Sequence, residues 1–139
     1  MYKRILAAND GSEGAARALQ AALRLAHAFG TELHMISVEE MPNIPTTIDE
    51  VVEEEQEAHK RFGQVIARAK TEAKTQGVKL TAHIVKGHAV PAIVRFIEGG
   101  KYDLLVIGYM GHSALYNRLI GSTTDRLVEL APCAVLVVK

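Results

Sequence analysis

Short apolar runs and longer amphipathic segments alternate along this chain. Compact runs such as Ile5–Ala8 and residues 104–107 are too short for helices and show no polar alternation, which is typical of strands covered on both faces of a parallel sheet. The segment from residue 78 to 84 instead alternates with period two, as expected of a half-buried strand. The expected strands are residues 5–8, 31–38, 78–84, 104–107 and 134–138, and the expected helices are residues 14–29, 48–76, 91–98 and 123–131.

Capping residues support these boundaries. Ser12 and Thr47 precede apolar helical patterns and carry the hydroxyl that caps a helix N-terminus. Gly30 and Gly77 follow two of the helices in the position where a left-handed backbone ends a helix. The pair at residues 99–100 is expected to end the third helix in the same way.

Strands and helices that alternate along a chain predict one parallel sheet with right-handed crossovers and helices on both faces. The predicted fold class is therefore α/β, an open, Rossmann-like five-stranded sheet formed by a single domain of residues 1–139. In a doubly wound sheet ligands bind where the strand order reverses, here between the first and fourth strands. That rule brings Asp10 and the loop from Gly108 to Gly121 to one crevice.

Composition narrows the function classes. A chain of 139 residues with 16 basic and 16 acidic side chains has no net field that would favour nucleic acid or an anionic membrane. The single cysteine, Cys133, excludes an internal disulfide and is typical of a reducing compartment. No apolar stretch reaches the length of a membrane span, so a cytoplasmic location is expected.

Three glycines separate the fourth strand from the last helix. Gly108, Gly111 and Gly121 have the spacing G-x2-G-x9-G-[ST] and lead into Ser122, which is expected to cap that helix. Backbone N–H groups at a helix N-terminus attract phosphate, and glycines let the backbone come close to it. The glycines could also serve turns alone, which is the better interpretation of an isolated pair. Three of them, followed by hydroxyl donors at Ser122, Thr123 and Thr124, favour a phosphate site. His112 and Arg118 are the cationic candidates in this loop.

Asp10 is the second candidate. It follows the first strand within the sequence Asn-Asp-Gly-Ser, at the sheet edge where ligands bind. Its carboxylate could accept hydrogen bonds from a base or a ribose. Asn-Asp-Gly-Ser is also strong turn chemistry, and the residues alone leave both roles open.

These motifs resemble the nucleotide-binding signature of the universal stress protein family, in its ATP-binding (UspA-like) subgroup. The likeness extends over the opening KRILAANDGSEGAARAL, the segment GHAVPAIV and the end APCAVLVVK. It implies strand order 3-2-1-4-5, a homodimer through the C-terminal strand, and ATP, AMP or ADP with Mg²⁺ or Mn²⁺ on the phosphates. Ala8 departs from the proline that the family often has two residues before the aspartate corresponding to Asp10. The implied contact set is Ala8, Asp10, Val38, Ile107, Gly108, Gly111, His112, Gly121, Ser122, Thr123 and Thr124.

Catalysis is not indicated by any motif. The glycine loop lacks G-K-[ST], so no lysine of that type reaches the phosphates, and no catalytic triad or metal-ligand spacing is recognisable. A nucleotide-binding sensor or regulatory module of the stress response is therefore favoured. A slow ATPase or nucleotidyl-transfer enzyme is the first alternative, and a structural dimerisation module without nucleotide is the second.

Overall fold

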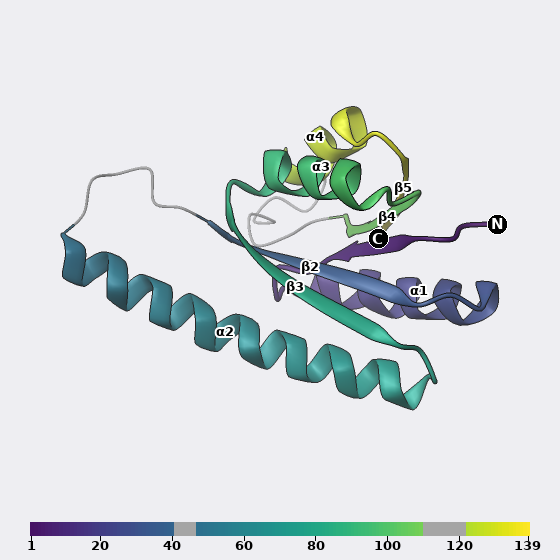
Figure 1. The fold of residues 1–139 in the computed structure, drawn as a ribbon, viewed down its shortest axis with the longest axis horizontal. Coiled ribbons are helices and arrows are strands. Elements are labelled where there is room, and N and C mark those ends of the chain that lie inside the picture. The colour runs from purple at the N-terminus through teal and green to yellow at the C-terminus, as the bar shows by residue number, and fades with distance from the viewer. Residues whose placement is uncertain (41–46, 110–121) are drawn as a thin grey trace.

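A parallel sheet forms the centre of the molecule in the computed structural model, which describes residues 1–40, 47–109 and 122–139 (Figure 1). The elements in chain order are β1 (Ile5–Ala8), α1 (Glu13–Phe29), β2 (Leu33–Glu40), α2 (Ile48–Thr75), β3 (Leu80–Gly87), α3 (Ala89–Gly100), β4 (Leu104–Gly108), α4 (Ser122–Leu130) and β5 (Ala134–Val138).

All strand pairs are parallel, and the sheet order is β3-β2-β1-β4-β5. β1 therefore lies at the centre, between β2 and β4, as the switch-point argument requires. The predicted α/β class and strand order are confirmed. That a single domain covers residues 1–139 stays a prediction.

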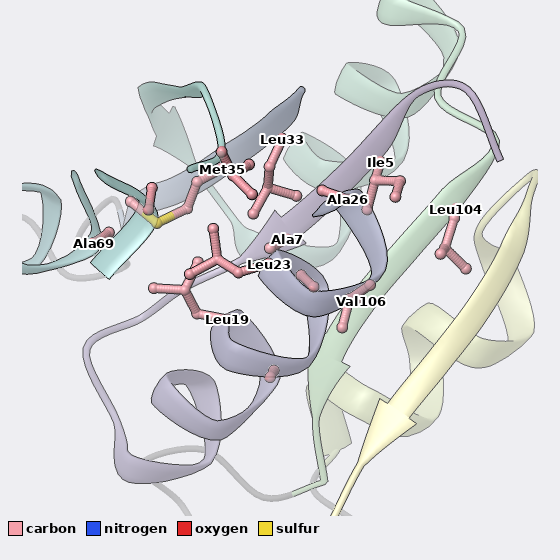
Figure 2. Packing of buried hydrophobic residues seen from close by; sticks show 14 residues of the cluster. Ile5, Ala7, Leu19, Leu23, Ala26, Leu33, Met35, Ala69, Leu104 and Val106 are labelled. Atoms are coloured by element: carbon pink, nitrogen blue, oxygen red, sulfur yellow. The ribbon is translucent and has the colours of Figure 1, made fainter. Parts of the chain in front are cut away.

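Helices cover both faces of the sheet. Figure 1 shows α1 and α2 on one side and α3 and α4 on the other. Successive residues of β1 explain why both faces are apolar, since Ile5 and Ala7 pack with α1 and α2 whereas Leu6 packs with α3 and α4. Figure 2 shows the first of these clusters, in which Leu19 and Leu23 of α1 lie against the strands.

The caps predicted for the first two helices are present. The Ser12 hydroxyl accepts a hydrogen bond from the Ala15 N–H, and Thr47 forms a capping box with Glu50 at the start of α2. Gly30 ends α1 with φ of 63°. Because these caps satisfy local backbone groups, nearby sequence alone was enough to predict them.

Several boundaries differ from the prediction by one to three residues, and two of them bear on the site. Glycines 99–100 are the last two residues of α3, and the left-handed residue that ends the helix is the C-cap Lys101, with φ of 55°. Gly100 serves packing instead, because a side chain there would overlap the ring of Tyr102. β2 also continues beyond Val38 to Glu40, because its ladder with β3 runs on to the pair Glu40 and Gly87.

Candidate functional site

The turn after β1 is held by its own polar side chains. Asn9 is buried, and its backbone N–H donates to the Ile36 carbonyl at 2.9 Å. Its side-chain oxygen accepts from the Gly11 N–H, and Asp10 Oδ1 accepts from the Ser12 N–H, both at 3.0 Å. Asp10 therefore does shape the turn, which was one of its two expected roles. The same bonds fix the position of its carboxylate at the sheet edge.

On the other side of β1, β4 meets the start of α4. The hydroxyl of Thr124, which is buried, donates to the Gly108 carbonyl at 2.8 Å. Gly108 lies close against the first turn of α1, where an added Cβ would come within 2.8 Å of the Gly14 carbonyl carbon. The absence of a side chain at residue 108 is thus required by helix packing, in addition to any approach of a ligand.

A pocket of about 330 Å³ opens between these two segments. It lies at the carboxyl ends of β1, β2 and β4, and its polar side chains come from the turn after β1, the end of β2, α2 and the start of α4. Its described lining residues are Ala8, Asn9, Asp10, Ser12, Ala15, Ile36, Val38, Glu40, Arg61, Phe62, Ala89, Ile93, Ile107, Gly108, Thr123, Thr124 and Leu127.

Most of the described candidates meet in this pocket. The predicted residues that line it are Ala8, Asp10, Val38, Ile107, Gly108, Thr123 and Thr124. Ser122 is exposed and is absent from the lining. It is the first residue of α4, so its expected role as the preceding cap does not match the observed helix start. Gly111, His112 and Gly121 lie outside the described residues, as does Arg118.

Sequence reasoning missed the contributions of α2 and of the end of β2. Arg61 and Phe62 belong to a helix whose charged exposed face gave no sign of a ligand. Glu40 lies beyond the predicted end of its strand, and its Oε1 accepts from the Ala89 N–H at the start of α3, at 3.2 Å. The His88 Nδ1 atom is 3.5 Å from Glu40 Oε2, and the His88 side chain is more than half exposed.

A second polar cluster lies at the opposite, amino-terminal edge of the sheet. His34 Nδ1 is 3.0 Å from both His83 Nε2 and the Tyr102 hydroxyl, while His34 Nε2 contacts Glu32 at 3.1 Å. The imidazole planes of His34 and His83 are within 8° of parallel, and the ring centres are 5.3 Å apart. The facing nitrogens then lie on the line between the rings, which is the geometry of a shared N–H···N bond and leaves no room for a metal ion.

Burial and hydrogen bonding shift the pKa values of three groups in this cluster. Burial lowers the pKa of His83, and the nearby His34 adds to that effect. The hydrogen bond with His34 lowers the pKa of Glu32, and burial raises that of Tyr102. Among the described residues, no group of three or more His, Cys, Asp or Glu side chains is placed to hold a metal ion. The described helices also include none long and apolar enough to cross a membrane.

The fold and the pocket together define a class: a doubly wound α/β protein with a ligand-sized pocket at its switch point. The particular family follows from sequence. The model of the universal stress protein family matches residues 1–139, and the chain belongs to that family.

Individual relatives agree with this assignment. The universal stress protein MJ0531 of Methanocaldococcus jannaschii is 33% identical over an alignment that covers all of this chain and 83% of the relative. The solved structure of hypothetical protein MJ0577 is 28% identical with a TM-score of 0.85, and the match covers 100% of this chain and 96% of that one. A universal stress protein solved in complex with cAMP is 26% identical with a TM-score of 0.78, covering 99% and 97% of the two chains.

Proposed function

We propose that this protein binds an adenine nucleotide in the pocket at the carboxyl ends of β1 and β4. The observation that carries the proposal is that the turn at Asp10 and the β4–α4 junction, about a hundred residues apart in sequence, line one pocket of about 330 Å³. That volume is within the range of small-molecule sites. The similar universal stress protein that was solved with cAMP supports an adenine ligand.

The pocket offers different chemistry at its two ends. Thr123 supplies a hydroxyl at the start of α4, where backbone N–H groups and the helix dipole favour phosphate, and Thr124, whose own hydroxyl is donated to the Gly108 carbonyl, ties this helix start to β4. Ile36 and Val38 supply an apolar wall on β2, suited to a base. Asp10 lies between them and is assigned to a ribose or base hydrogen bond. Gly111, His112, Gly121 and Ser122 remain proposed phosphate contacts on the strength of the glycine spacing.

The finer assignments belong to the same proposal. ATP is the expected physiological ligand, with AMP or ADP as variants, and Mg²⁺ or Mn²⁺ would be held mainly by phosphate oxygens and water. The protein would act in the cytoplasm as a homodimeric sensor or nucleotide-dependent regulatory module of the stress response. The missing G-K-[ST] lysine favours binding over fast hydrolysis.

The test is calorimetric titration of nucleotide-stripped protein with ATP, AMP, cAMP and GTP, with and without Mg²⁺. Asp10→Asn keeps an oxygen for the Ser12 N–H but removes the carboxylate charge, so the turn is preserved. We expect adenine nucleotides to bind and Asp10→Asn to weaken that binding about tenfold, as for loss of a hydrogen bond to a charged group. Asp49→Asn, at an exposed site in the first turn of α2, is the matched control and should bind like the wild type.

No heat with any nucleotide, from protein with a cooperative unfolding transition, would contradict the proposal and favour a dimerisation module. Release of phosphate from ATP, lost in Asp10→Asn, would instead support the slow ATPase.

A further inference from the structure

Helix α2 is packed directly against the turn that carries Asp10. An added Cβ on Gly11 would lie 3.2 Å from Val65 Cγ2 of α2. One turn earlier, Phe62 is only 1% exposed and lines the pocket. This packing fixes the register of α2 on the core, so the neighbouring Arg61, an exposed side chain, lies at the pocket.

Charge at the pocket is unequally distributed. Among its described lining residues, the charged side chains are Asp10, Glu40 and Arg61. Glu40 accepts from the Ala89 N–H, so its carboxylate is directed toward the start of α3. Of these three charged residues two are carboxylates, so Arg61 is the one cation that the described part of the chain supplies to the pocket.

The guanidinium of Arg61 is also oriented. Its central carbon lies 4.8 Å from the centre of the Phe62 ring, within the range of a cation–π contact. Because Phe62 is buried, that ring cannot move, and it supports a planar group beside the pocket. A guanidinium held in this way can stack on an aromatic ring or a nucleobase, which an ammonium group cannot do.

The position of α2 decides which part of a ligand Arg61 meets. α2 packs against α1 and β3, so it reaches the pocket from the side of β2 and β3. Thr123 and Thr124 reach it from β4, on the other side of β1. With the phosphates at the threonines, the opposite end of the pocket receives the base.

The geometry points to Arg61 as a base-binding residue, whose guanidinium, supported by Phe62, contacts the nucleobase next to Val38. This inference rests on the proposed nucleotide function. It adds to the contacts proposed for Asp10 and the glycine loop a further contact from α2. It also makes α2 part of the site, so that a bound base would bridge α2 and β2.

The experiment compares Kd values for adenosine, AMP and ATP in the wild type, Arg61→Gln and Arg61→Lys. Arg68→Gln is the matched control, because Arg68 is an exposed arginine on α2 that does not line the pocket. We expect both Arg61 variants to bind all three ligands about fivefold more weakly, with the same factor for each, since the lost contact is to the base. Arg68→Gln should leave the Kd values unchanged, and melting temperatures of all variants should match that of the wild type.

Three results would overturn the inference. A wild type that binds nucleotide with unchanged affinity in Arg61→Gln would remove Arg61 from the site while leaving the proposed function intact. A loss that grows with the number of phosphates and is restored by Arg61→Lys would place Arg61 on the phosphates. A folded wild type that binds none of the three ligands would reject the proposed function itself, and this inference with it.

Discussion

The imidazoles of His34 and His83 show how a single residue comes to depend on the fold. They lie on the neighbouring strands β2 and β3, and His34 Nδ1 is 3.0 Å from His83 Nε2. The same His34 nitrogen is 3.0 Å from the Tyr102 hydroxyl. Two protonated rings would direct N–H groups at one another, so a charged His83 is disfavoured beside His34 in the folded protein. Arg4, above the Tyr102 ring, adds further positive charge nearby, while Glu32 and Lys79 lie on the outer side of His34.

This cluster predicts a pH dependence of stability. Burial and His34 lower the pKa of His83 in the folded state below the ordinary value of 6.5. The unfolded chain therefore binds this proton more readily, and the free energy of unfolding falls as the pH drops through 6.5. The pKa of Glu32 is lowered from an ordinary value of 4.5, so Glu32 affects the free energy of unfolding only at more acidic pH.

We expect His83→Gln to lose less stability than the wild type between neutral and mildly acidic pH, in urea unfolding at a series of pH values. His59→Gln, at an exposed site on α2, should keep the wild-type pH slope. Identical slopes for the wild type and His83→Gln would show that the histidine pair does not couple protonation to folding.

At the scale of the elements, the contact of β4 with α1 at the pocket leaves no space for a side chain on residue 108. An added Cβ at Gly108 would lie 2.8 Å and 2.9 Å from the Gly14 carbonyl carbon and oxygen. Backbone atoms cannot rotate away as a flexible side chain can, so α1 or β4 would have to shift. Since Thr124 bonds to the Gly108 carbonyl, such a shift would also reach α4.

Gly108→Ala is therefore expected to reduce the free energy of unfolding by about 1–3 kcal/mol, the usual cost of overpacking, in urea denaturation. Gly63→Ala on α2 is the matched control, because an added Cβ there meets nothing within 4 Å. It should be neutral, or more stable by up to about 1 kcal/mol, since alanine favours a helix over glycine. Equal stability of Gly108→Ala and wild type would show that the junction can relax.

For the whole molecule, β5 is the edge strand through which the proposed homodimer would form. It is the last strand of the described sheet, beside β4, and Leu136 on it is 37% exposed. Apolar edge strands tend to pair with other chains unless charge or bulk prevents it. The proposed homodimer through β5 would cover this edge.

Sedimentation over a concentration series should show a wild-type dimer, and Leu136→Lys should sediment as a monomer because a charged lysine opposes strand pairing. Val128→Lys, on an exposed apolar position of α4, should remain dimeric. A wild-type monomer at all concentrations, or a dimer that Leu136→Lys leaves unaffected, would remove β5 from the interface.

Local pattern was sufficient for most of the fold. The Ser12 and Thr47 caps, the Gly30 helix end and the apolar strands each depend on neighbouring residues, so their chemistry is visible in a short window of sequence. Strand alternation and the switch-point rule then brought Asp10 and Gly108 to one pocket, as the structure shows. Whether these residues hold a nucleotide stays a prediction.

By itself, then, the sequence determined the order of elements, the parallel sheet and the edge at which polar residues gather. Only the tertiary structure decided that Arg61 lines the pocket, that Gly100 makes room for Tyr102 and that Gly108 makes room for α1. The physical reason is the sequence separation of the interacting residues. Caps and strands are specified by neighbours along the chain, whereas these contacts join segments far apart in sequence and depend on how each crossover helix packs on the sheet.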